Sequence, residues 1–127
     1  RIRSKGKQDF LYGYFEARIR LPIGKGIWPA FWMMPTKSVY GSWPRSGEID
    51  IMESIGKEHS TVHGTLHYSD DPSTGNHQYK TSHSNLWEHE KFSTDFHNFA
   101  VLKQPNSIAF YLDGSEYSKV TKKDVTH

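Results

Sequence analysis

Three carboxylates lie within one stretch of six residues, 48–53 (EIDIME), and are the groups of this chain whose types and spacing could do chemistry. In an extended strand alternate side chains point to opposite faces, so Glu48 and Asp50 share one face and the isoleucines beside them share the other. Strict alternation would then give the acidic face Met52 in place of Glu53. One extra residue in the strand, a β-bulge, would return Glu53 to that face, and bulges are enriched beside active sites.

Three acids this close cannot all ionise cheaply, so we expect the pKa of at least one of them to be raised. A proton held near neutral pH on one acid, beside an ionised partner, is what a general acid and a nucleophile require. At ~3.3 Å per residue the Cα atoms of Glu48 and Glu53 would lie roughly 13–16 Å apart. Side chains that lean together could then reach the separation of about 5–5.5 Å used by retaining glycosidases. The alternative is a solvated strand face that happens to be acidic.

Three tryptophans, Trp28, Trp32 and Trp43, precede this acidic stretch. Large flat amphipathic rings beside carboxylates suit a sugar, whose ring has apolar C–H faces and polar edges. The alternative is core packing, and Trp28, next to Pro29 in an apolar run, fits either role. Trp43 lies in a polar turn where burial is less expected, so we favour a binding role for it.

Short strands separated by turn signals must position these residues. Alternation and apolar runs predict strands at residues 12–21, 27–34, 48–54, 61–68, 77–83, 95–103, 107–112 and 116–120. Hairpins are expected at residues 104–106 and at Asp113-Gly114, and residues 85–93 could hold one helical turn. No long amphipathic helix is visible, so the predicted class is all-β, a sandwich or a barrel.

The composition of the chain excludes several classes of protein and several kinds of site. The 127 residues make one domain or part of one, and the lack of an initial Met before the strand-like start (RIRS) indicates part of a longer chain. A net charge of +2 leaves no electrostatic footprint for nucleic acid or an anionic membrane. Cysteine is absent, which excludes a disulfide frame, a thiolate nucleophile and a cysteine zinc site. No apolar run approaches the ~20 residues of a membrane span.

The acidic hexapeptide resembles the signature of glycoside hydrolase family 16. Further motifs resemble the laminarinase branch of that family, at residues 12–22 (YGYFEARIRLP), 26–35 (GIWPAFWMMP), 41–44 (GSWP), 61–67 (TVHGTLH) and 96–114. The six-residue spacing of the acids separates this chain from the lichenase-type branch, whose acidic motif is one residue shorter.

This resemblance implies an all-β fold, a β-sandwich jelly roll of the concanavalin A-like kind. Residues 1–127 would be the central part of a single catalytic domain, and we expect the sandwich to be incomplete at both ends. The implied activity is retaining endo-hydrolysis of β-1,3-glucan (laminarin-type) linkages. Glu48 would be the nucleophile and Glu53 the general acid/base, while Asp50 would hold and tune the nucleophile.

By the same resemblance, Trp32 and Trp43 would stack on sugars, Trp28 is a further substrate-binding candidate, and His67 would line the cleft. The expected partner is a β-glucan polysaccharide or oligosaccharide, with no nucleic acid, membrane, cofactor or metal. A polymeric substrate implies a secreted, extracellular protein, which we expect to be a monomer.

Three alternatives stay open. A non-catalytic β-glucan-binding protein on the same scaffold would typically lack the glutamates that this chain retains. A metalloenzyme could use His59, His63 and His67, which recur every four residues, although no His-Glu-x-x-His helix is present and we favour structural histidines. A family member could act on mixed-linkage glucan or a galactan, but sulfated substrates would favour a more basic cleft than residues 28–53 offer.

Overall fold

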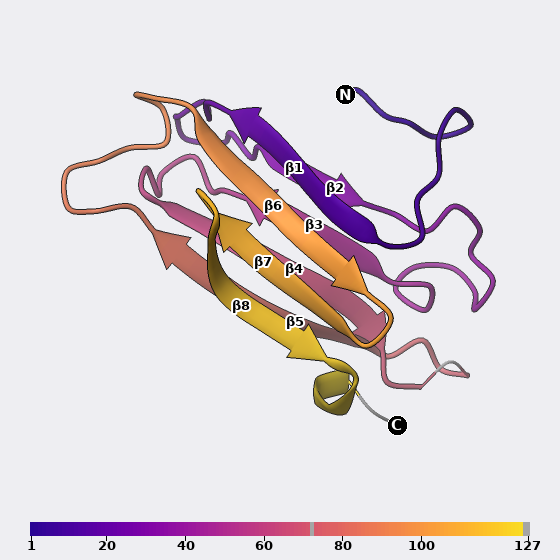
Figure 1. Cartoon of the computed structure of the whole chain (residues 1–127). Coiled ribbons are helices and arrows are strands. Elements are labelled where there is room, and N and C mark those ends of the chain that lie inside the picture. Colours follow the sequence, from indigo (N-terminus) through magenta and orange to yellow (C-terminus); the bar gives the residue numbers. More distant parts are fainter. Residues whose placement is uncertain (72, 126–127) are drawn as a thin grey trace.

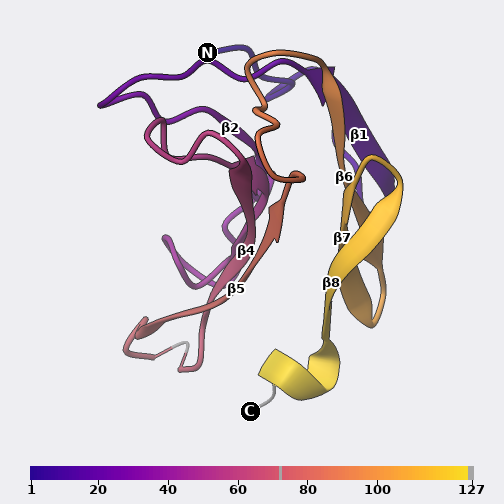
Figure 2. The ribbon, with the colours of Figure 1, turned by 90° about the vertical axis from the view of Figure 1, so that its left-hand side faces the viewer.

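The computed structural model describes residues 1–71 and 73–125 and folds them into two four-stranded antiparallel sheets that face each other (Figures 1 and 2). One sheet has the order β1-β6-β7-β8 and the other the order β2-β3-β4-β5. The strands are β1 (Gly13–Ile19), β2 (Ala30–Met33), β3 (Glu48–Glu53), β4 (Thr61–Ser69), β5 (His77–Asn85), β6 (His97–Gln104), β7 (Ser107–Leu112) and β8 (Ser115–Thr121). The predicted all-β class is confirmed.

Two local differences separate the structure from the sequence-based expectation. The segment after β5 contains turns and no helical turn, and His89 within it has φ 73°. A short 3-10 helix, η1 (Lys122–Val125), follows β8 and was not expected. In the described part of the chain, no helix has both the length and the apolar character needed to cross a membrane.

Both predicted hairpins are present. β6 and β7 pair around Pro105-Asn106, and β7 and β8 pair around Asp113-Gly114. Asp113 and Gly114 have φ values of 48° and 80°, and the tight turn between two twisted antiparallel strands requires such positive values. The Asp113 carboxylate also accepts a hydrogen bond from the backbone N–H of Asn98, which ties the turn to β6.

The core lies between the sheets in two adjoining clusters. The first contains Leu21, Met52, Val62, Phe92, Phe99 and Leu112, and the second contains Ile49, Ile51, Val101, Phe110 and Val120. The sheets approach closely at Gly64 of β4, where an added Cβ would lie 2.7 Å from a ring carbon of Phe110 and 2.5 Å from the hydroxyl of Tyr117. Gly64 faces the core, and the packing of the two sheets therefore restricts its position to glycine.

Candidate active site

A β-bulge interrupts the pairing of β3 with β4. Asp50 lies opposite Thr65, and Glu53 lies opposite His63, so three steps along β3 match two steps along β4. The extra residue reverses the alternation of side chains between Asp50 and Glu53. The predicted bulge is confirmed.

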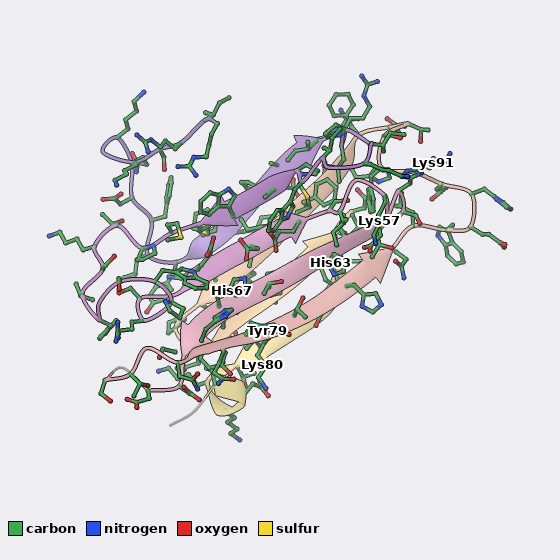
Figure 3. All side chains as sticks on the ribbon, turned by 180° about the vertical axis from the view of Figure 1, so that it is seen from behind. Lys57, His63, His67, Tyr79, Lys80 and Lys91 are labelled. Atoms are coloured by element: carbon green, nitrogen blue, oxygen red, sulfur yellow. The ribbon has the colours of Figure 1, made fainter. Side chains whose placement is uncertain are left out.

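The core side of β3 shows the same reversal. Ile51 and Met52 are consecutive, yet both are buried in the core with 1% of their surface exposed. Anchored in this way, the strand presents Glu48, Asp50 and Glu53 on the opposite, outer face. Figure 3 looks onto that face of the sheet, where His63 and His67 of β4 are labelled.

Asp50 is the most deeply buried of the three acids, with 4% of its surface exposed. Burial is the largest influence on its pKa, and the negative charges of Glu53 and Glu48 add to it; together they raise the pKa of Asp50 to about 7. The crowding of three carboxylates therefore raises the pKa of Asp50, the middle acid. The sequence indicated the crowding but not which acid it would affect.

Each outer glutamate accepts a hydrogen bond from a tryptophan indole. Trp43 Nε1 donates to Glu48 Oε2 over 2.7 Å, and Trp28 Nε1 donates to Glu53 Oε1 over 2.9 Å. The two indoles are 48% and 74% exposed, so neither is a core residue, and the core alternative for Trp28 is wrong. An indole N–H can only donate, so each bond orients one carboxylate and leaves its other oxygen available. From the sequence these rings were expected as sugar platforms or core residues, and the role of their N–H groups was not predicted.

The loop before β2 holds Trp28 against the end of β3. Gly24 N–H donates to the carbonyl of Gly56 over 3.0 Å, and Gly56 N–H donates to the carbonyl of Ile27 over 2.9 Å. A side chain at Gly56 would collide with the carbonyl of Gly24. Two backbone hydrogen bonds and a close approach thus fix the residue immediately before Trp28.

The loop between β2 and β3 holds Trp43 in a similar way. Ser46 Oγ donates to the carbonyl of Gly41 over 2.8 Å and accepts from the N–H of Tyr40 over 3.2 Å. These bonds close the loop across the cis peptide that joins Trp43 to Pro44. The indole is therefore carried by a folded loop, directly upstream of the strand that carries its carboxylate partner.

Trp32 lies beside the acids on β2, opposite Asp50 in the register of β2 with β3. Its side chain is half-buried, and the guanidinium of Arg1 lies 5.2 Å from the centre of its ring. The structure therefore brings Trp32 to the acidic face, as it does Trp28 and Trp43.

His67 of β4 connects the acids to a residue that the sequence reasoning missed. His67 Nε2 lies 3.0 Å from Asp50 Oδ2, and His67 Nδ1 lies 2.9 Å from Nε2 of His77, the first residue of β5. Burial is the largest influence on His67 and lowers its pKa, while the charge of Glu48 acts in the opposite direction. His77 is an isolated histidine in the sequence, and only the pairing of β4 with β5 reveals its neighbour.

An open hollow of about 170 Å³ adjoins Glu53 on this face. It is lined by Trp28, Glu53, Ile55, His63, Thr65 and Thr81. An indole, two hydroxyls and an imidazole around a carboxylate give both an apolar wall and polar partners, the combination that a sugar ring uses.

The cluster of Asp50, Glu53 and His67 offers ligand atoms that all lie within 4.8 Å of one another, close enough for one cation. Two of those atoms already lie within hydrogen-bond distance of each other, as Asp50 Oδ2 and His67 Nε2. Asp50 and His67 are thus partners of each other, while Glu53 is bonded to Trp28 Nε1.

The three histidines weighed as metal ligands do not form a group among the described residues. His63 lies 3.1 Å from Glu58, and His67 lies against Asp50, while His59 lies in the turn before β4. Each of the two strand histidines thus has its own carboxylate partner.

The whole chain, residues 1–127, matches the family model for glycosyl hydrolases family 16. The chain belongs to glycosyl hydrolase family 16. It is 40% identical over 128 residues to a beta-glucanase of Rhodothermus marinus, an alignment that covers 99% of this chain and 43% of that protein. It is 43% identical over 121 residues to a glucan endo-1,3-beta-glucosidase of Cryptopygus antarcticus, covering 91% and 42% of the two chains.

Among solved structures, the endo-beta-1,3-glucanase of Pyrococcus furiosus superposes with a TM-score of 0.84 at 42% identity and covers 95% of this chain and 46% of that one. The predicted family 16 membership and β-sandwich jelly-roll fold are confirmed. The family 16 chain described here spans less than half the length of each of these relatives.

Proposed function

We propose that this family 16 chain carries the catalytic centre of a retaining endo-hydrolase of β-1,3-glucan. One observation carries the proposal: Glu48 and Glu53 lie on the same face of a bulged strand, and each is held by a tryptophan N–H. Two carboxyl groups flanking one bond are what retaining glycoside hydrolysis requires.

In the first step Glu48 attacks the anomeric carbon while Glu53 protonates the leaving oxygen. Trp43 binds Oε2 of Glu48, which leaves Oε1 as the attacking atom. Trp28 binds Oε1 of Glu53, which leaves Oε2 to carry the proton. Both acids are thereby oriented before substrate arrives, and such preorganisation contributes directly to rate.

In the second step Glu53 acts as the base that activates water, and the water releases the sugar from Glu48. During this step Glu48 is esterified to the sugar and uncharged, so the ionised Glu53 and Asp50 are the neighbouring acids that can repel each other. With a pKa of about 7, Asp50 carries its proton for part of the time at neutral pH, which reduces that repulsion.

The substrate class is proposed from the site and from the relatives. Trp32 and Trp43 would stack on sugar rings near the scissile bond, with His67 and Trp28 lining the cleft. The names of the relatives point to glucans, and a net charge of +2 fits a neutral polysaccharide better than a sulfated one. A polymer of this kind is met outside the cell, so we place the protein there, as a monomer.

The decisive experiment compares the protein with its Glu48→Gln variant on laminarin, lichenan, agarose and carrageenan. We expect reducing ends to be released from laminarin by the wild type alone, and the first product seen by NMR to be the β-anomer. Unchanged hydrolysis by the variant would contradict the role of Glu48. Binding of laminarin without hydrolysis by the wild type would instead identify a glucan-recognition protein.

A further inference from the structure

We propose that His77 is a positioning residue of this site and acts on the acidic strand through two neighbours, His67 and Trp43. The kinetic part of the proposal rests on the hydrolase function proposed above. Its structural part, the ordering of the His67 ring, does not depend on any activity.

The first connection is a chain of hydrogen-bonding groups. His77 Nε2 lies 2.9 Å from Nδ1 of His67, whose Nε2 lies 3.0 Å from Oδ2 of Asp50. A neutral imidazole has one donor nitrogen and one acceptor nitrogen, so the bond at one nitrogen decides the role of the other. When Asp50 is ionised, His67 must donate through Nε2 and accept at Nδ1, and His77 must supply the donor. A mobile water at Nδ1 could also donate, but it would hold the His67 ring less firmly than a donor tethered to β5.

The second connection is ring packing. The ring of His77 lies 4.6 Å from the ring of Trp43, centre to centre, with the two planes tilted by 44°. The N–H of the same indole donates to Glu48 Oε2 over 2.7 Å. His77 therefore supports the indole that orients the proposed nucleophile.

The backbone of His77 is itself held in place. Asp70 Oδ2 accepts from the side-chain amide of Asn76 over 3.2 Å and from that of Gln78 over 2.9 Å, so the residues on both sides of His77 are tied to one carboxylate. Besides His67 and Trp43, the ring of Tyr79 lies 5.8 Å from that of His77. Figure 3 labels His67 and Tyr79 on the outer face of the two strands. A histidine fixed in this way can hold its neighbours in a single arrangement.

Two substitutions separate the two connections. His77→Phe keeps a ring against Trp43 but removes the hydrogen bond to His67. His77→Gln removes the ring but keeps an amide that can donate or accept. His83→Phe is the matched control, because His83 is an exposed histidine on the same strand and the same face, with its ring 6.3 Å from that of His63.

The state of His67 is read from the ¹⁵N chemical shifts of its two ring nitrogens at a pH well above the Asp50 pKa of about 7, and kcat and KM are measured on laminarin in parallel. We expect His77→Phe to shift and broaden the Nδ1 resonance of His67, because the ring loses its fixed donor there while Asp50 keeps the proton on Nε2. We expect it also to lower kcat about fivefold, the size of one lost hydrogen bond, with KM nearly unchanged. His77→Gln should recover the wild-type ¹⁵N pattern and part of kcat, and His83→Phe should match the wild type.

An unchanged ¹⁵N pattern of His67 in His77→Phe would overturn the proposal whatever the activity. A fall in kcat that His77→Gln does not reverse would show that only ring packing matters, and would overturn the hydrogen-bonding role. If the wild type hydrolyses none of the glucans, the proposed function fails, while the ¹⁵N pattern still tests the positioning of His67. If His77→Phe does not fold, the ¹⁵N pattern of His77→Gln decides, and a broadened Nδ1 resonance of His67 there contradicts the proposed donor.

Discussion

Trp43 donates its indole N–H to Oε2 of Glu48 over 2.7 Å, from the loop that leads directly into the strand carrying that carboxylate. A hydrogen bond to an ionised carboxylate is stronger than one between neutral groups. The bond fixes which oxygen of Glu48 faces the substrate, so the ring has a role besides stacking on sugar.

Replacement of Trp43 by Phe should therefore lower kcat on laminarin. The Phe ring keeps a flat apolar surface but lacks the N–H, and a charged hydrogen bond contributes about 1.5–3 kcal/mol when water is excluded. Because Trp43 is half exposed, water can replace part of the bond, so we expect a loss of about tenfold. Trp87→Phe is the control, since Trp87 is 84% exposed and lies in the loop after β5. Equal kcat in Trp43→Phe and the wild type would limit this ring to stacking.

Replacement of Trp28 by Phe should have a different signature, because its indole N–H is bonded to Glu53. Glu53 is needed to protonate the leaving oxygen, and a good leaving group does not need that proton. We expect Trp28→Phe to lower kcat/KM strongly on laminarin. The loss should be weak on the dinitrophenyl glycoside of a laminarin oligosaccharide. Trp43→Phe should slow both substrates, because both require attack by Glu48. Equal losses on the two substrates in Trp28→Phe would contradict the assigned role of Glu53.

Because the two sheets approach closely at Gly64, we expect a larger residue at this core position to lower the stability of the protein. Gly64→Ala would place a methyl group 2.7 Å from the ring of Phe110, and overpacking of this kind typically costs about 1–3 kcal/mol. We expect the free energy of unfolding in urea to fall by that amount. Phe110→Leu in the same chain should make the added methyl less costly, because the two side chains compete for one space. Additive losses in the double variant would show that Gly64 and Phe110 do not share that space.

Local sequence patterns predicted the strands and turns that position the site, but not the side-chain contacts within it. The turn at Asp113-Gly114 was predictable because it depends on adjacent residues, and the bulge was predictable because Glu53 would otherwise face the core. The indole bond of Trp28 depends on backbone bonds between distant loops, which no spacing encodes. The contact of His77 with His67 depends on the register of β4 with β5, in which His77 pairs with Ser69. The loop of residues 70–76 separates those strands. Shifting the pairing by two residues would keep the same side chains on the same face, so alternation alone does not decide the register.

The raised pKa of Asp50 predicts how stability depends on pH. An aspartate whose folded pKa is about 7 against an ordinary 3.8 binds its proton more tightly in the folded state. Its contribution to stability is therefore complete below about pH 4, and is lost as pH rises toward 7. At 1.36 kcal/mol for each pKa unit the loss amounts to at most about 4 kcal/mol.

Asp50→Asn removes this titration and keeps a side chain of nearly the same shape. We expect the free energy of unfolding of the variant, relative to that of the wild type, to rise between pH 4.5 and pH 8, measured by urea unfolding at both values. Carboxylates common to both proteins cancel in that difference, so the slope reports Asp50 and the groups coupled to it, Glu48, Glu53 and His67. A difference that is constant with pH would mean that Asp50 ionises normally in the folded protein. The repulsion that we assign to the three acids would then have to be relieved by another group of the cluster.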